Sequence, residues 1–298
     1  MLQVPEGLKG KVLHISQELE KAGNEVLISC EPCYGACDLR DSEAKRLGCG
    51  KIIHYGHSRL VDSVVPAEYA EMKSEEKIEI SENEIKKLGG FNKVGLVSTL
   101  QFVDSLPRIK EQLEKIGKEV FVGKSSGKNL CEGQVLGCNT SAAKAVESGV
   151  DCFLFIGSGR FHPIGVALAA KKPVFVFDTE KNRIEKVETE KFLRQRLATI
   201  ELARDAKVFG ILVSTKPGQM NLKAAEELKK KLEKLGSGRT AHILIMDEIK
   251  QEKVDYLGGG ESGGIDAYIN TACPRIGIED RTSFRKPILN LDEAEEIL

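Results

Sequence analysis

The sequence LEKAGNEVLI, at Leu19–Ile28, has two variant copies further along the chain. They are LEKIGKEVFV at Leu113–Val122 and LEKLGSGRTAHILI at Leu232–Ile245. Each copy reads as the end of an amphipathic helix, a glycine suited to end that helix, and an apolar strand. A helix–glycine–strand join is common in α/β proteins, so the shared LEK-x-G letters are what indicate a repeat. The starts lie 94 and 119 residues apart, which predicts three similar α/β units, with domains at 1–85, 86–187 and 188–298.

The composition is that of a soluble globular protein. The 298 residues are 41% hydrophobic and 30% charged, with a formal net charge of −1. This balance argues against a broad, direct nucleic-acid surface, which is usually basic. No apolar run approaches the ~18 residues of a membrane span, and the N-terminal residues do not resemble a signal peptide. We therefore expect a cytoplasmic protein that contacts no membrane.

Eight cysteines stand at positions 30, 33, 37, 49, 131, 138, 152 and 273. In a reducing cytoplasm a disulfide framework is not expected, which leaves metal binding, catalysis or plain burial. The segment Cys30–Cys37 has a compact metal-like spacing, but a local zinc or iron–sulfur site there lacks an obvious fourth ligand apart from Cys49. Any one cysteine taken alone is more often a small buried hydrophobe.

Each unit has one cysteine-bearing loop that follows a predicted strand. Cys37 follows the expected strand Glu25–Ser29, and Cys138 lies between the expected strand Glu119–Val122 and a helix. In YINTACPRIGIED, Tyr268–Asp280, the strand is expected to end at Cys273, because Pro274 cannot continue it. Ligands collect at the carboxyl ends of strands in α/β sheets. If the units pack about a pseudo-threefold axis, the three cysteines form one cluster.

Two other loops carry weaker signals. Gly157-Ser158-Gly159 follows a predicted strand and could bring backbone N–H groups to a carboxylate or a ribose. His54 and His57 lie at another strand end, where one partly buried and one surface imidazole would be the ordinary outcome.

Six motifs occur in order over nearly the whole chain. They are QVPEGL (Gln3–Leu8), YGACDL (Tyr34–Leu39), HYGHS (His54–Ser58), LGCNTS (Leu136–Ser141), GRFHP (Gly159–Pro163) and ACPRI (Ala272–Ile276). This ordered set resembles the archaeal diphthamide synthase family, the 2-(3-amino-3-carboxypropyl)histidine synthases. The resemblance implies three Rossmann-like α/β domains with parallel sheets around a central 4Fe–4S cluster. It also implies that Cys37, Cys138 and Cys273 are the cluster ligands and that Cys30, Cys33 and Cys49 are structural or incidental.

The resemblance further implies a radical-type transferase that uses S-adenosylmethionine as cosubstrate. Reductive cleavage at the cluster would release methylthioadenosine and place the 3-amino-3-carboxypropyl group on C2 of a histidine in translation elongation factor 2. A homodimer and a reducing electron donor are the implied partners. The residues expected around cosubstrate and cluster are Gly157, Ser158, Gly159, Arg160, Gln219, Arg275, His54 and His57.

Two other functions fit the same pattern of three units and three cysteines. One is a quinolinate-synthase-like hydro-lyase, in which an open iron acts as a Lewis acid on a small substrate. The other is a scaffold that holds a metal for stability and performs no reaction.

Overall fold

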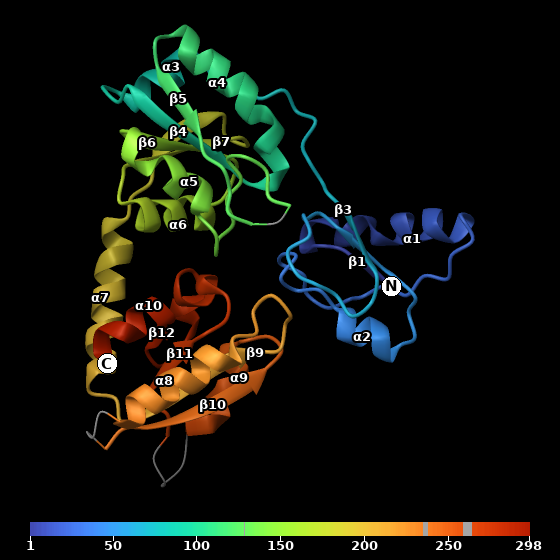
Figure 1. The fold of residues 1–298 in the computed structure, drawn as a ribbon, viewed down its shortest axis with the longest axis vertical. Helices are drawn as coiled ribbons and strands as arrows, with labels where there is room; N and C mark the ends of the chain where they lie inside the picture. Colours follow the sequence, from blue (N-terminus) through green and yellow to red (C-terminus); the bar gives the residue numbers. More distant parts are fainter. Residues whose placement is uncertain (128, 235–237, 259–263) are drawn as a thin grey trace. The chain divides into compact units, whose positions relative to one another are not determined.

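The computed structural model describes residues 1–127, 129–234, 238–258 and 264–298, without the side chains of residues 256 and 258. The chain forms two compact units, Met1–Val187 and Glu188–Leu298, and each is described by itself. The first unit contains two sheets and the second contains one (Figure 1). The finer division of the first unit at residues 85 and 86 stays a prediction.

The first sheet is small and parallel. Its strands, in sheet order, are β1 (Leu2–Gln3), β2 (Ile52–Tyr55) and β3 (Ala67–Ala70). The helices of this part are η1 (Glu6–Lys11), α1 (Val12–Lys21) and α2 (Asp41–Arg46). An apolar cluster packs beside it, and its buried members are Leu39, Ala44, Ile52 and Val65. A three-stranded sheet with so small a cluster has little hydrophobic stabilisation of its own.

The second sheet is larger and is covered on both faces. Its strands, in sheet order, are β5 (Glu119–Val122), β4 (Lys93–Ser98), β6 (Cys152–Ile156), β7 (Val174–Asp178) and β8 (Arg183–Lys186). All pairs are parallel except β7 with β8. Its helices are α3 (Glu82–Ile85), η2 (Lys86–Leu88), η3 (Leu100–Ser105), α4 (Leu106–Lys115), α5 (Ser141–Val146), η4 (Glu147–Gly149) and α6 (Phe161–Ala170). Every residue of β6 is buried, as expected for a central parallel strand between two layers of helices.

The second unit is built on one parallel sheet. Its strands, in sheet order, are β10 (Thr240–Met246), β9 (Val208–Ser214), β11 (Ala267–Asn270) and β12 (Ile288–Asn290). Its helices are α7 (Glu190–Arg204), α8 (Leu222–Lys234), α9 (Gln251–Val254), η5 (Asp255–Gly258), η6 (Pro274–Gly277), η7 (Asp280–Ser283), α10 (Leu291–Ala294) and η8 (Glu295–Ile297). Two buried apolar clusters, around Phe209 and around Tyr268, pack against this sheet.

The repeat is fully formed in its second copy. There α4 ends before Gly117, whose φ is +85°, and β5 follows. In the third copy α8 and β10 are present, but the intervening Gly236 lies outside the described residues. The first copy differs, because the expected strand Glu25–Ser29 makes only a single bridge, between Ile28 and Leu2. Its partner β1 is two residues long, too short to support a longer ladder.

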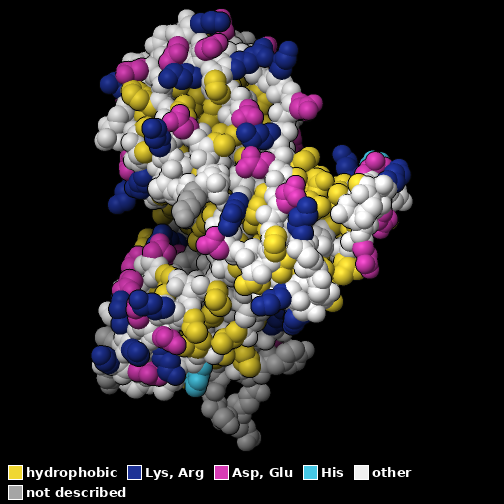
Figure 2. All heavy atoms as spheres, turned by 45° about the vertical axis from the view of Figure 1, so that its right-hand side comes forward, with side chains coloured by type: hydrophobic (Ala, Val, Ile, Leu, Met, Phe, Trp, Pro, Cys, Tyr) yellow, Lys and Arg dark blue, Asp and Glu magenta, His cyan; other side chains and the backbone are white. Residues whose placement is uncertain are grey.

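The described surface shows no separation of charge on the face in Figure 2, where Lys and Arg side chains alternate with Asp and Glu. This distribution agrees with the near-zero net charge. None of the described helices has the length and apolar character needed to cross a membrane.

Candidate functional site

Cys37 is half-buried in a turn between β1 and α2. The turn closes where the Asp38 backbone N–H donates to the Gly35 carbonyl over 3.0 Å. Fully buried Gln3, in β1, clamps the residues that follow. Its Nε2 donates to the Asp38 carbonyl at 2.6 Å, and its Oε1 accepts from the Arg40 N–H at 3.2 Å. Gln3 therefore fixes the path of the chain next to Cys37.

Cys138 lies at the tip of a narrow turn before α5. Leu136 and Asn139 exchange two backbone hydrogen bonds across it, at 2.8 and 3.1 Å. The Asn139 side chain donates to the Ser126 carbonyl and accepts from the Ser141 N–H. Gly137 has no room for a side chain, because an added Cβ would lie 1.8 Å from the ring of Phe161. Close backbone approach thus places Cys138 at the carboxyl side of the larger sheet.

Cys37 and Cys138 lie close enough to interact electrostatically. Although the residue Cys138 is exposed, desolvation by the protein around its thiol raises the thiol pKa, and the charge of the Cys37 thiolate raises it further. The first unit therefore brings together two of the three predicted cluster ligands from loops that are distant in sequence.

Cys273 belongs to the second unit and lies immediately before η6, as its N-cap residue. Strand β11 ends at Asn270, three residues earlier than the sequence analysis expected. The reason is local, because the side chain of Asn270 caps the turn. Its Nδ2 donates to the Cys273 carbonyl at 2.8 Å and its Oδ1 accepts from the Ala272 N–H. Pro274 then starts the 3-10 helix at its first position.

The loop Gly157–Arg160 joins the carboxyl end of β6 to the start of α6. Gly157 and Gly159 have φ of +146° and +82°, which disfavour any other residue. The Gly157 N–H donates to the Phe177 carbonyl at the end of β7. Arg160 is exposed, and among the described residues no carboxylate forms an ion pair with it.

The remaining predicted cosubstrate residues lie in the second unit. Gln219 sits in the turn after β9, where its backbone N–H donates to the Lys216 carbonyl at 2.9 Å. Arg275 lies two residues beyond Cys273, and its Nε donates to the carboxylate of Glu279 at 2.8 Å. Arg275 is therefore partly neutralised by a neighbour, whereas Arg160 is not.

His54 and His57 lie together at the end of β2. The Nε2 atom of His54 lies 3.0 Å from Nδ1 of His57. Burial lowers the pKa of His54 to about 3, with a further contribution from His57, and burial lowers the pKa of His57 to about 4. Both rings are therefore neutral near pH 7. The fully buried Cys33 completes a compact group with them, a grouping that sequence reasoning missed.

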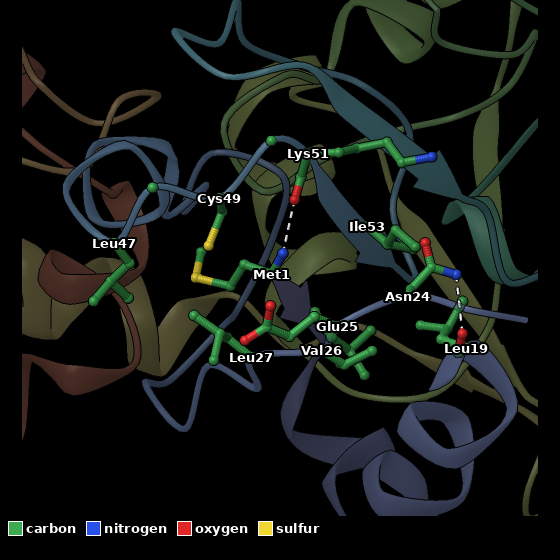
Figure 3. A pocket seen from close by; sticks show the side chains of 13 residues that line it. Met1, Leu19, Asn24, Glu25, Val26, Leu27, Leu47, Cys49, Lys51 and Ile53 are labelled. Atoms are coloured by element: carbon green, nitrogen blue, oxygen red, sulfur yellow. Dashed lines mark hydrogen bonds between the residues drawn. The ribbon is translucent and has the colours of Figure 1, made fainter. Parts of the chain in front are cut away.

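A cavity of about 370 Å³ opens at the opposite end of the small sheet, and Figure 3 shows its lining. Met1, Leu27, Leu47 and Cys49 contribute to it, and the Met1 amino group donates to the Lys51 carbonyl beside it. Neither Cys37 nor Cys138 lines this cavity. The predicted cluster site therefore lies at the cysteine loops and does not coincide with this cavity.

Comparison with known proteins gives a consistent result over the whole chain. Residues 4–298 match the family described as diphthamide synthesis protein. The chain is 38% identical to the 2-(3-amino-3-carboxypropyl)histidine synthase of Pyrococcus horikoshii, covering 100% of this chain and 85% of that protein. It is 30% identical to the synthase of Methanocaldococcus jannaschii, covering 98% of this chain and 82% of that protein.

The fold agrees with a solved relative. The crystal structure of Dph2 from Pyrococcus horikoshii with a 4Fe–4S cluster matches with a TM-score of 0.88 at 37% identity, over 99% of this chain and 85% of that one. This likeness confirms the predicted class of three similar α/β units with parallel sheets.

Proposed function

Because the chain belongs to the family of diphthamide synthesis proteins, we propose that it is a 2-(3-amino-3-carboxypropyl)histidine synthase. It transfers the 3-amino-3-carboxypropyl group of S-adenosylmethionine to C2 of a histidine imidazole in translation elongation factor 2. The other product is methylthioadenosine, and the reaction is the first step of diphthamide biosynthesis.

The proposed cofactor is a 4Fe–4S cluster held by Cys37, Cys138 and Cys273. Cysteine thiolates are the usual ligands of such clusters, and three protein ligands leave one position for a substrate, the general arrangement of reactive metal sites. The observation that carries this proposal is the full-length match to the crystal structure of Dph2 from Pyrococcus horikoshii with a 4Fe–4S cluster. The electrostatic interaction between the Cys37 and Cys138 thiols in the first unit supports it. When bound, the cluster supplies the electron that breaks the bond between the sulfonium sulfur and the aminocarboxypropyl carbon.

The chain's own residues then bind and orient the cosubstrate. Backbone N–H groups at Gly157, Ser158 and Gly159 suit the ribose or carboxylate, because glycine allows close approach of the backbone. Arg160 suits the cosubstrate carboxylate, since its guanidinium has no carboxylate partner among the described residues and can donate two hydrogen bonds. Gln219 and Arg275 are the corresponding candidates in the second unit, and His54 and His57 are proposed to lie beside the cofactor site.

The proposed partners follow from the reaction. Elongation factor 2 is the protein substrate, which places the reaction in the cytoplasm, and a separate donor supplies the reducing electron. A homodimer would suffice, because one chain carries all three proposed cluster ligands. The relatives described above are named as histidine synthases, so neither a quinolinate-synthase-like hydro-lyase nor an inert scaffold is proposed.

Single Cys→Ala substitutions test the ligand set. After anaerobic reconstitution, the variants at 37, 138 and 273 should each lose cluster iron and methylthioadenosine formation. Cys30→Ala and Cys49→Ala are matched controls and should keep both. Equal loss in the controls would reject the ligand set.

A further inference from the structure

We propose that Cys33, His54 and His57 form a second metal site, separate from the three cluster cysteines, that takes one zinc-class divalent ion. One ligand atom from each of these residues lies within 4.8 Å of the other two. In the described part of the chain, no other group of three His, Cys, Asp or Glu side chains has its ligand atoms this close together, and Cys37 is not a member of this one. This inference does not depend on the proposed function.

The spacing suits a tetrahedral ion. Zinc lies ~2.0–2.1 Å from imidazole nitrogen and ~2.3 Å from thiolate sulfur, so ligand atoms around it are separated by about 3.3–3.6 Å. His54 Nε2 and His57 Nδ1 are already 3.0 Å apart. Closing the site requires a small shift of the Cys33 side chain and a slight separation of the two rings.

Hydrogen bonds to Gln3 select the tautomer of His54 that a metal needs. Gln3 Oε1 accepts from the Arg40 backbone N–H, which identifies it as the oxygen of the amide. His54 Nδ1 lies 3.3 Å from the same oxygen, so Nδ1 must carry the proton and donate. The lone pair of Nε2 therefore points toward His57 and Cys33. A ligating histidine whose other nitrogen donates to a fixed oxygen is the usual arrangement in metal sites.

The third ligand is held from its backbone. The backbone N–H of Cys33 donates to the carboxylate of Glu6 at 3.3 Å, and Cys33 is only 1% exposed. His57 is only half-buried, which provides access for an ion and for a water in the fourth position. Two nitrogens and one sulfur favour zinc over the hard oxygen-seeking ions calcium and magnesium.

Binding of the metal ion involves proton transfer and bond formation to the three ligands, with no oxidation or reduction. The Cys33 thiol loses its proton to solvent and forms the metal–sulfur bond. His57 moves its proton from Nδ1 to Nε2 and binds through Nδ1, while His54 binds through Nε2 unchanged. One proton is therefore released for each ion bound.

The structural effect would be to join the cysteine-rich turn to β2. Cys33 lies in the turn that carries Cys37, and His54 lies in the central strand of the small sheet. The largest apolar cluster beside that sheet has four buried members, and small units of this kind often gain stability from a metal. The ion would thus hold the Cys37 turn in position before any cluster is assembled.

Cobalt(II) is the probe for the test, because its bond to a thiolate gives a charge-transfer absorption band. Iron-free full-length protein, purified anaerobically with a chelator, is titrated with cobalt and then competed with zinc. We expect one ion per chain, a thiolate–cobalt band and a higher unfolding temperature. Cys33→Ser should abolish the band, and His57→Gln should weaken binding by more than about 100-fold, beyond the usual loss of an outer-shell contact.

The controls separate this site from the cluster. Cys30→Ser, an exposed cysteine of the same turn, should bind cobalt as the wild type does, and so should Cys37→Ala and Cys138→Ala. A band that survives in Cys33→Ser, or one that disappears in Cys37→Ala, would overturn the proposal. If Cys33→Ser does not fold by circular dichroism, His57→Gln decides, and unchanged cobalt affinity there would overturn it equally.

Discussion

The side-chain amide of Asn270 donates to the side-chain oxygen of Asn290 at 2.7 Å, and this pair holds the turn at Cys273. Asn270 also donates to the Cys273 carbonyl, and Asn290 donates to the Pro274 carbonyl at 3.0 Å. Both asparagines are more than nine-tenths buried. The proposed third cluster ligand is thus placed by two neighbouring strands, β11 and β12, through their final residues.

Asn270→Ala should loosen the Cys273 turn. It removes hydrogen bonds to Cys273, Asn290 and the Ala272 N–H, and leaves buried polar groups without a partner. The expected cost is about 1–3 kcal/mol of unfolding free energy, with a lower iron content after reconstitution. Asn24→Ala, whose side chain donates to the Leu19 carbonyl at an exposed helix end, is the matched control. Denaturant unfolding and iron analysis measure both effects, and equal results for the two variants would contradict this role of Asn270.

Gly137→Ala should disrupt the Cys138 turn. The new methyl group would lie 1.8 Å from the Phe161 ring, so either the ring or the turn must move. Overpacking of this kind typically costs about 1–3 kcal/mol. Gly149→Ala is the control, because an added Cβ there meets nothing within 4 Å. Thermal unfolding should separate the two variants, and a Gly137→Ala protein as stable as Gly149→Ala would refute the packing argument.

Stability of the metal-free protein should fall as the pH is lowered from about 6.5. The folded protein lowers the pKa of His54 to about 3 and that of His57 to about 4, from their ordinary value of 6.5. At a pH between the folded and the ordinary pKa, the unfolded chain binds more protons than the folded one, so acid favours unfolding. Each histidine adds a slope of up to about 1.4 kcal/mol per pH unit.

Urea unfolding between pH 7 and pH 5, in the presence of a chelator, measures this slope. His57→Gln should make it shallower, whereas substitution of the exposed His14 by Gln should leave it unchanged. An unfolding free energy with the same pH dependence in His57→Gln and wild type would contradict the assignment.

Arg160→Gln should raise KM for S-adenosylmethionine by at least about 10-fold, the loss expected for a charged hydrogen bond. Folding should not change, because Arg160 is exposed. Arg275→Gln should have a smaller effect, because Arg275 already pairs with Glu279. Arg194→Gln, an exposed arginine on α7 that pairs with Glu190, is the control. Steady-state formation of methylthioadenosine measures KM. A larger increase in KM for Arg275→Gln than for Arg160→Gln would contradict the assignment and indicate that Arg275 binds the carboxylate.

Much of the fold could be predicted, because its signals are local. Gly117 and the apolar run after it encode a helix end and a strand that form as expected. The segment Glu25–Ser29 has the same local pattern but makes one bridge, because the length of its partner β1 is not visible in its own sequence. Strand pairing depends on both members, so the local pattern of one segment does not determine how long the ladder becomes.

Some features of the candidate site could likewise be predicted from the sequence, and others could not. Cysteines in loops after strands could be identified, since strand ends and proline positions are readable from sequence. The grouping of Cys33 with His54 and His57, and the clamp formed by Gln3, could not. Gln3 and His54 are 51 residues apart and meet only through the β1–β2 pairing. The one signal in the sequence was a glutamine, Gln3, between the apolar residues Leu2 and Val4.

The most direct test of the central claim is the product analysis of one anaerobic reaction. Reconstituted, reduced protein is mixed with S-adenosylmethionine and elongation factor 2, and the nucleosides and the modified protein are analysed by mass spectrometry. The proposed function predicts methylthioadenosine together with one 3-amino-3-carboxypropyl group on a histidine of elongation factor 2. Deoxyadenosine as the nucleoside product, or an unmodified histidine, would contradict it.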